Sequence, residues 1–162
     1  MTKNNIGIIK VLVLIMLIMV LSFTVACSKS NINSNDENSV KIEASLENVE
    51  VQENGRYISK EEVAKYLIEY EKLPSNFVKK DIARSQGWIS DLGNLEDVLP
   101  GKSIGGDVFM NFEEQLPEAD YIECDINYKG GYRGPQRLVF SYGGNIYYTE
   151  DHYENFEKVY ES

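Results

Sequence analysis

The segment from Tyr121 to Tyr153 constrains the fold of this chain more than any other stretch of its sequence. Polar and apolar residues alternate over 121–126, the period of two that is typical of a β-strand with one face in the core. The glycine pairs at 130–131 and 143–144 each favour a tight turn, because glycine adopts positive φ without steric cost. The pattern predicts antiparallel strands at 121–126, 137–140 and 146–149. A short loop with the single histidine, His152, follows the last of them.

Four ionisable side chains of this segment could gather on one concave face of such a meander: Glu123, Arg133, Arg137 and His152. Glu123 alternates with Cys124, so we expect it to point away from the apolar face of its strand. One carboxylate, one imidazole and two guanidinium groups supply a base, an acid and phosphate-binding cations, which suffice to cleave RNA without a metal. The same spacing also fits a solvated face with two salt bridges and a surface histidine.

Three short helices are expected upstream of these strands. Ser59-Lys-Glu-Glu62 is typical of a capping box, and apolar residues follow at helical spacing until Pro74, which is expected to end the helix. The other two helices are expected over 79–86 and 94–98, the last one capped by Asn94. Helices followed by strands predict an α+β fold, with N-terminal helices packed on one antiparallel β-sheet.

Glycines and apolar residues between these elements carry further expectations. Gly87 occupies the C-cap position of the second helix, and Trp88 and Ile89 after it are expected in the core. Gly105-Gly106 is expected to form a tight turn into a strand over 107–111.

The N-terminal residues differ from the rest of the chain. Residues 1–26 are predicted to form a lipoprotein-type signal peptide, because Lys3 and Lys10 precede an apolar stretch that ends at Ala26. Lipidation of Cys27 would then anchor a secreted, extracellular protein to the outer face of the cell membrane. Ordinary signal cleavage, which would release the protein, is the alternative. A flexible polar tether is expected over 27–56 and a single domain over 57–162.

The sequence argues against a nucleotide-binding P-loop and against a metal or cofactor site. Gly101-Lys102-Ser103 lacks the upstream glycine of a nucleotide-binding P-loop, since Glu96 stands at that position. No metal or cofactor is expected, because one histidine and one cysteine outside the signal provide no set with metal-ligand spacing. That cysteine, Cys124, has no disulfide partner once Cys27 is acylated and is expected as a small buried apolar residue.

Several motifs resemble one known family. They are Glu-x-Asp-Ile-Asn-Tyr at 123–128, Gly-Tyr-Arg at 131–133, Thr-x-Asp-His-Tyr at 149–153 and Pro-Gly-Lys-Ser-Ile-Gly-Gly-Asp at 100–107. Together they resemble the barnase-like microbial guanyl-specific ribonucleases, over roughly residues 57–162. The resemblance implies an endoribonuclease that cleaves single-stranded RNA after guanosine through a 2′,3′-cyclic phosphate. Glu123 would be the general base and His152 the general acid. Lys80, Arg133 and Arg137 would bind phosphate.

By the same resemblance, base recognition would involve Phe109, Met110, Asn111, Phe112, Glu113 and Tyr153. Two departures from the family bear on guanine preference and on inhibitor binding. Phe112 stands where an arginine is common, and the loop over 114–120 is about three residues shorter than in barnase.

Charge bears on the expected partners, which are RNA and a barstar-like inhibitor protein, with a monomeric state and membrane contact only through the lipid anchor. The chain has a formal net charge of −10, and residues 57–162 carry 11 Lys and Arg against 20 Asp and Glu. Such acidity opposes attraction of a polyanion. The alternative function is therefore a catalytically weak or inactive ribonuclease-fold lipoprotein that binds nucleotides or a protein partner.

Overall fold

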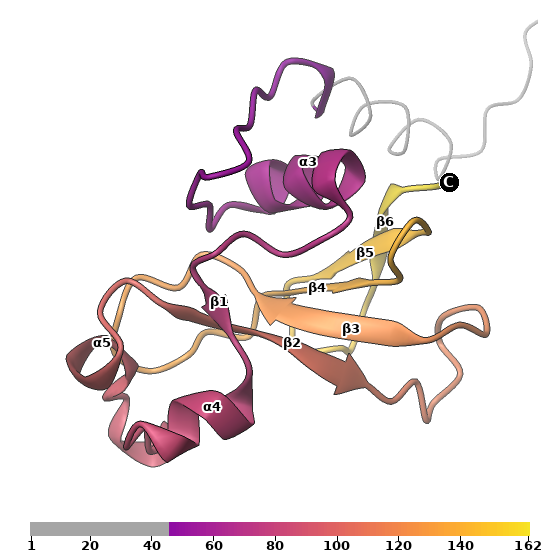
Figure 1. Ribbon diagram of the computed structural model, residues 1–162. Coiled ribbons are helices and arrows are strands. Elements are labelled where there is room, and N and C mark those ends of the chain that lie inside the picture. Colours follow the sequence, from indigo (N-terminus) through magenta and orange to yellow (C-terminus); the bar gives the residue numbers. More distant parts are fainter. Residues whose placement is uncertain (1–45) are drawn as a thin grey trace, which may run out of the picture. The chain divides into compact units, whose positions relative to one another are not determined.

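The computed structural model describes residues 46–162, in which helices lie mainly before the strands (Figure 1). The helices are α3 (Lys60–Tyr70), α4 (Lys80–Ser85), the 3-10 helix η1 (Ser90–Leu92) and α5 (Leu95–Val98). The strands are β1 (Phe77–Val78), β2 (Ser103–Phe109), β3 (Tyr121–Asp125), β4 (Arg137–Phe140), β5 (Ile146–Thr149) and β6 (Glu157–Tyr160). The predicted signal peptide over 1–26 and the predicted lipidation site Cys27 lie outside the described residues.

The strands form one six-stranded sheet in the order β1-β2-β3-β4-β5-β6. Strands β2 to β6 pair antiparallel, but β1 runs parallel to β2, with Phe77 beside Ser103. The sheet is therefore mixed, and the prediction of one antiparallel sheet is wrong at β1. A strand of two residues is too short to show a periodic pattern, and the connection over 79–102 is long enough for the crossover that parallel strands need.

Three strands of the sheet lie close to the positions that the sequence predicts for them. The predicted strands at 121–126, 137–140 and 146–149 correspond to β3, β4 and β5. Strand β6 has no counterpart among the predicted strands, because Val159 is its single fully buried residue and no alternation marks it.

Helix α3 begins where the capping box predicts. The Ser59 hydroxyl oxygen accepts a hydrogen bond from the backbone N–H of Glu62 at 3.4 Å and donates one to the Glu62 carboxylate at 2.5 Å. The helix ends at Tyr70, because Glu71 adopts the left-handed conformation with φ 49° and its N–H bonds to the carbonyl of Leu67. Pro74 therefore follows the end of the helix and does not cause it, contrary to the prediction.

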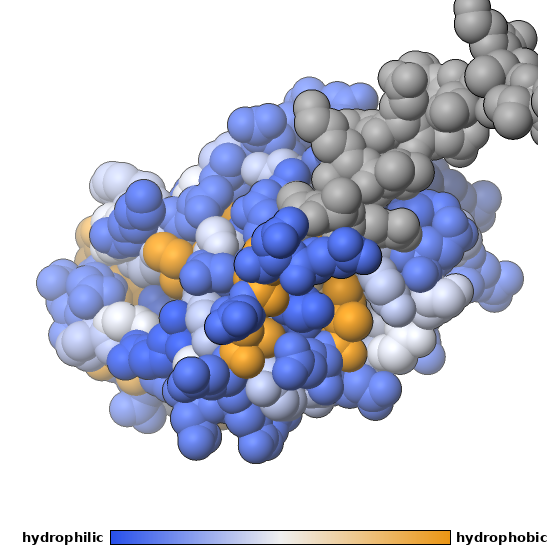
Figure 2. All heavy atoms as spheres, turned by 90° about the horizontal axis from the view of Figure 1, so that it is seen from above, coloured by the Kyte–Doolittle hydropathy of each residue, from blue (hydrophilic) through white to orange (hydrophobic). Residues whose placement is uncertain are grey.

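The main core lies between α3 and one face of the sheet. Its buried members are Leu46, Val63, Ala64, Leu67, Cys124, Ile126, Leu138, Phe140, Ile146 and Val159. Cys124 is a fully buried thiol, as expected, and burial raises its pKa well above the ordinary value. Where the view from above shows described residues, the surface is mostly hydrophilic with isolated hydrophobic residues (Figure 2).

A second cluster forms around Trp88, which packs with Ala83, Leu95, Ile104 and Tyr128. The Asn94 side chain accepts from the N–H of Ile89 at 2.8 Å and donates to the carbonyl of Gly87 at 3.1 Å. It therefore ties down the turn after α4 and does not cap α5, contrary to the prediction. Ile89 is exposed, so its predicted core position is also wrong.

Gly105 and Gly106 lie inside β2 and do not form the predicted turn before it. The pairing of β2 with β3 shifts between Gly105 and Asp107, which marks a β-bulge, and Gly106 has φ 98°. A Cβ on Gly105 would lie 2.5 Å from the Cβ of Cys124. Glycine is thus required here by the close approach of β2 to β3.

The opposite face of the sheet is also covered, around β3. Leu116, Tyr121, Val139 and Tyr147 form a third buried cluster there, with Phe109, Tyr153 and Phe156 packed against it. Glu123 points to this face, away from Cys124 as predicted, but it is only 6% exposed. The segments before β3 and after β5 fold over the sheet, so the polar face of β3 is not solvated.

Part of the segment predicted as a tether packs on α3. Leu46 and Val51 are buried, and the Tyr66 hydroxyl donates to the carbonyl of Glu53 at 2.6 Å. The packed region therefore begins upstream of residue 57. None of the helices in residues 46–162 has both the length and the apolar character needed to cross a membrane.

We expect Gly105→Ala to lower the free energy of unfolding by about 1–3 kcal/mol, because the added methyl group meets Cys124 in a packed core. Gly134→Ala is the matched control, since a Cβ there meets nothing within 4 Å. Urea unfolding of the purified proteins measures both. Equal stability of the two variants would contradict the steric requirement.

Candidate active site

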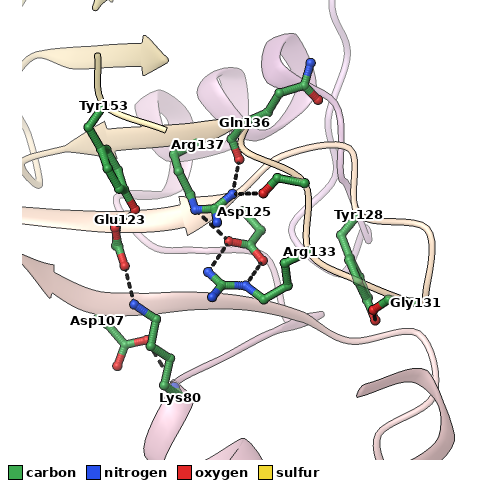
Figure 3. A network of polar contacts seen from close by, with 11 residues as sticks. Lys80, Asp107, Glu123, Asp125, Tyr128, Gly131, Arg133, Gln136, Arg137 and Tyr153 are labelled. Carbon is green, nitrogen blue, oxygen red and sulfur yellow. Dashed lines mark hydrogen bonds and ion pairs between the residues drawn. The ribbon is translucent and has the colours of Figure 1, made fainter. Parts of the chain in front are cut away.

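Glu123 lies at the centre of a polar network on the face of β3 opposite α3 (Figure 3). One carboxylate oxygen is 2.5 Å from the ammonium of Lys80, and the other accepts a hydrogen bond from the hydroxyl of Tyr153. Burial first, and then the bond to Glu123, raise the pKa of the Tyr153 phenol. Tyr153 therefore remains a donor at neutral pH, and both oxygens of Glu123 are engaged.

Lys80 is placed by the start of α4. Its backbone N–H donates to the carboxylate of Asp107 at 3.0 Å, whereas the N-cap residue Lys79 makes no side-chain cap bond. Asp107 follows the bulge of β2, so the bulge directs a carboxylate at the first N–H groups of the helix. This bond fixes the end of α4 that carries Lys80 beside Glu123.

Asp125 binds both predicted arginines. The guanidinium of Arg133 makes two hydrogen bonds to it, each 2.6 Å long. Nε of Arg137 is 3.0 Å from Asp125, yet its N–H is not directed along a hydrogen bond, so we treat this contact as an ion pair. Nη1 of Arg137 donates to the carbonyls of Gly134 and Gln136, both at 2.7 Å.

Burial opposes the charge of Arg133, but hydrogen bonding and attraction from Asp125 outweigh it and raise the pKa of Arg133 above its ordinary value. Both guanidinium groups are therefore fixed, charged and oriented before any ligand binds. Preorganised cations of this kind stabilise negative charge without rearranging.

His152 lies in a tight loop after β5. His152 and Tyr153 have φ values of 61° and 79°, in the left-handed region that few non-glycine residues adopt. Thr149 and Asp151 hold this conformation: the Thr149 hydroxyl oxygen accepts from the N–H of Tyr153 and donates to Asp151, both at 2.9 Å. The His152 ring is exposed, with its centroid 4.7 Å from that of Tyr153.

Asp151 is the second support of the loop. Its carboxylate accepts from the Asn155 side chain at 2.7 Å and from the Asn155 backbone at 2.9 Å. Chiefly the Asn155 side chain, and then its backbone N–H, lower the pKa of Asp151 to about 2. We call this set of bonds from Thr149 and Asn155 to the Asp151 carboxylate the Asp151 cage. The cage was not predicted, although Thr149 and Asp151 belong to the Thr-x-Asp-His-Tyr motif at 149–153. Asp side chains often bond nearby backbone N–H groups in turns.

An open pocket of about 290 Å³ lies beside this loop. Its lining includes Phe109, Met110, Asn111, Phe112, Glu113, Gln115, His152, Tyr153, Glu154 and Phe156. All six residues predicted to bind the base therefore share one pocket with the predicted general acid. Tyr153 links the pocket to the polar network, because its ring packs on Phe109 at 5.1 Å between centroids while its hydroxyl reaches Glu123.

Two pocket residues behave differently from the sequence expectation. Asn111 turns its side chain inward: it donates to the carbonyl of Leu116 at 2.6 Å and accepts from the Leu116 N–H at 3.2 Å, so it closes the loop. Gln115 was not predicted, yet it donates to Glu113 at 2.8 Å and to the Tyr153 carbonyl at 3.3 Å. Gln115 thus fixes the Glu113 carboxylate against the His152 loop, and no sequence signal marks it.

The described residues place Glu123, Lys80, Arg133 and Arg137 in one network, with His152 at the rim of the adjoining pocket. Acid–base chemistry on a bound phosphate ester is within reach of this set. In residues 46–162, no group of three or more His, Cys, Asp or Glu is arranged to hold a metal ion.

The Asp151 cage predicts a specific acid response. The folded-state pKa of about 2 lies below the ordinary aspartate pKa of 3.8, so the bonds around Asp151 stabilise the loop above pH 3.8 and lose this contribution as the pH falls through about 2. In ¹³C NMR we expect the Asp151 carboxyl to titrate near pH 2 and Asn155→Ala to raise that midpoint. Glu154→Ala is the control, and an unchanged midpoint in Asn155→Ala would rule out the cage as the cause.

Comparisons with known proteins identify the family. The family model described as ribonuclease matches residues 60–160. The chain is 50% identical over 100 residues to a ribonuclease of Heyndrickxia coagulans, and the match covers 60% of this chain and 92% of that protein. It is also 50% identical over 100 residues to a ribonuclease of Bacillus intermedius, and this match covers 60% of this chain and 62% of the Bacillus protein. It is also 46% identical over 55 residues to guanyl-specific ribonuclease St of Saccharopolyspora erythraea, covering 32% of this chain and 54% of that protein. Because the family model spans more than half of the chain, the chain belongs to the ribonuclease family, and its resemblance to the barnase-like ribonucleases is confirmed.

Proposed function

We propose that the protein is an extracellular endoribonuclease that cleaves single-stranded RNA after guanosine by metal-independent transesterification. The observation that carries the proposal is the buried carboxylate of Glu123, held between a lysine and a tyrosine, next to two fixed arginines and the His152 pocket. The similar proteins from Heyndrickxia and Bacillus are ribonucleases, which supports the proposal.

The first step is an attack of the substrate on itself. Glu123 accepts the proton of the ribose 2′-hydroxyl, and the 2′-oxygen then attacks the adjacent phosphorus. His152 donates a proton to the departing 5′-oxygen, which leaves a 2′,3′-cyclic phosphate. Because both oxygens of Glu123 are engaged in the free protein, the 2′-hydroxyl replaces either Lys80 or Tyr153 at one of them.

The second step opens the cyclic phosphate with water. His152 now takes a proton from the water and Glu123 returns its proton to the 2′-oxygen, so the two residues exchange roles. DNA lacks the 2′-hydroxyl and has no nucleophile for the first step. Lys80, Arg133 and Arg137 face the phosphate throughout and stabilise the negative charge that develops on its oxygens.

Guanine would occupy the pocket beside His152. The Glu113 carboxylate accepts from the N1–H and N2–H₂ donors of guanine, a pair that adenine does not present, and Gln115 holds this carboxylate in place. The name of the Saccharopolyspora relative supports this preference. Phe112, at 82% exposure on the rim of the pocket, supplies apolar surface but no cation.

A second candidate function rests on charge. With 20 Asp and Glu against 11 Lys and Arg in residues 57–162, a ribonuclease-fold lipoprotein that binds nucleotides or a protein partner without turnover is the alternative. Extracellular location, anchoring through Cys27 and inhibition by a barstar-like protein belong to the proposal: the pattern of residues 1–27 supports the first two, and the resemblance to barnase-like ribonucleases supports the third.

The purified protein should cleave RNA but not DNA in the presence of EDTA and leave 2′,3′-cyclic phosphate ends. Glu123→Gln and His152→Gln should each lower kcat by about two to four orders of magnitude, because each removes a proton-transfer group. Glu161→Gln, at the exposed C-terminus, is the control. A strict need for Mg²⁺ or Zn²⁺, or near-full turnover in either variant, would overturn the mechanism.

Phe112→Arg should raise kcat/KM for RNA and steepen its decrease with salt, since it adds a cation at the rim of the base pocket. Tyr142→Arg adds the same charge at another exposed aromatic residue, outside this pocket, and should have a smaller effect. Rates measured from low to physiological salt test this. Equal responses of the two variants would show that net charge matters and position does not.

A further inference from the structure

A second open groove, of about 450 Å³, lies apart from the catalytic network, and we call it the Arg56 groove. Three segments meet in it: the approach to α3, the turn between α5 and β2, and the loop after β3. Tyr128, in that loop, lies on the far side of Arg133 from Glu123 (Figure 3). None of the lining residues belongs to the base pocket or binds the carboxylates of the network. They are Arg56, Ile58, Asn76, Glu96, Gly101, Lys102, Ser103, Tyr128, Lys129 and Gly130.

The groove gathers cations that have no counter-charge. Of the 12 Lys and Arg in residues 46–162, half form ion pairs with carboxylates of that range. Those that do not are Arg56, Lys65, Lys79, Arg84, Lys102 and Lys129. Three of these line the groove, against one acidic residue, Glu96. The groove therefore carries excess positive charge within an acidic domain.

Two of the three cations are held in place by neutral groups. Nη2 of Arg56 donates to the carbonyl of Gly101, and a Cβ on Gly101 would lie only 2.6 Å from that nitrogen, so glycine permits the close approach. The ammonium of Lys102 donates to the carbonyl of Ser75 at 2.6 Å. Lys129 is exposed, and its side chain has no partner within residues 46–162. Because carbonyl groups carry no net charge, all three positive charges remain available to an anion.

A buried hydroxyl group adds a neutral donor to the same groove. Ser103 is 2% exposed, and its backbone N–H donates to the carbonyl of Asn76 at 2.8 Å. The Ser103 hydroxyl, by contrast, has no hydrogen-bond partner in the part of the chain that the structure describes. Side-chain polar groups of buried residues usually have a partner, so a free hydroxyl that lines a groove points to a ligand. Gly101-Lys102-Ser103 is thus not a P-loop, yet it lines an anion-binding groove.

We propose that the Arg56 groove is a second ligand site of this chain and binds a phosphate group. A phosphate group carries up to two negative charges and presents three acceptor oxygens, which match a guanidinium, two ammonium groups and a hydroxyl. A carboxylate offers one charge and two oxygens and leaves part of this set unmatched. The volume of the groove lies in the range of ligand pockets, roughly 300–1,000 Å³, so an organic group attached to the phosphate also fits.

The test is an NMR titration of the full chain with inorganic phosphate, with NaCl adjusted to keep the ionic strength constant. We expect the backbone amide signals of Lys102, Ser103 and Gly130 to shift and to saturate with a single Kd. Arg56→Gln and Lys129→Gln should each raise this Kd on the order of ten-fold, because each removes a charged donor. Lys129→Gln breaks no bond of the folded chain, so its effect reports on the ligand and not on stability.

Two further variants check the sign of the effect. Glu96→Gln should lower the Kd, because it removes the one negative charge of the lining while its amide oxygen can still accept from the N–H of Gly101, now at 2.9 Å. Lys65→Gln removes an unpaired cation of α3 outside the groove and should leave the Kd unchanged. Absence of saturation at the groove, or equal Kd values in Lys129→Gln, Glu96→Gln and the unaltered chain, would overturn the site.

The source of the phosphate group is distinguished by a second probe, glycerophosphoglycerol, which is the soluble headgroup of phosphatidylglycerol. Tighter binding of inorganic phosphate assigns the groove to a free phosphate or a phosphomonoester, and tighter binding of the diester assigns it to a lipid headgroup. Acetate at the same ionic strength is the control and should not saturate. Acetate binding as tight as that of both phosphate probes would overturn the preference for phosphate. This readout needs no RNA cleavage, so the result stands apart from the proposed ribonuclease activity.

Discussion

The pairing of Asp125 with Arg133 and Arg137 is the interaction on which the rest of the site depends. All three side chains are mostly or fully withdrawn from water, and Asp125 and Arg137 are buried. Removal of the carboxylate would leave two adjacent guanidinium groups without their counter-charge, which is strongly destabilising in a buried site. Asp125 therefore allows this small domain to hold the side chains of Arg133 and Arg137 in fixed positions against its core.

Strand β3 carries residues of the main core on one face and residues of the site on the other. One face contributes Cys124 to the main core under α3, and the other presents Tyr121, Glu123 and Asp125 in a row. Neighbouring strands and loops supply a partner for each of these residues. Phe109, which lines the base pocket, pairs with Tyr121, and Lys80 and Tyr153 contact Glu123. The two arginines bind Asp125 at the other end of the strand. The bulge at Gly105–Gly106 contributes because it places Asp107 to bind the first turn of α4 and so positions Lys80.

The sequence predicted those features that depend on local pattern. Alternation and glycine turns located β3, β4 and β5, and the capping box located the start of α3. Features that depend on distant contacts were not predictable. The parallel pairing of β1 involves two residues, and the burial of Glu123 arises only when the loops before β3 and after β5 cover the sheet. The inward turn of Asn111 likewise requires Leu116 to be in place.

The balance of positive and negative charges in the site gives contacts that do not depend on charge a larger share in binding RNA. Lys80, Arg133 and Arg137 are matched in the same network by Glu123, Asp125 and Asp107, within a domain that is itself acidic. The cations are well oriented for a phosphate, but the site has little excess positive charge to attract one from a distance. With Phe112 in place of a cation at the pocket rim, affinity for RNA must come largely from short-range contacts. Exposed aromatic surface at the rim of the base pocket, Phe112, is the kind of contact that salt does not screen. On the proposed function, such contacts would hold the RNA, and the fixed cations would act mainly in the reaction itself.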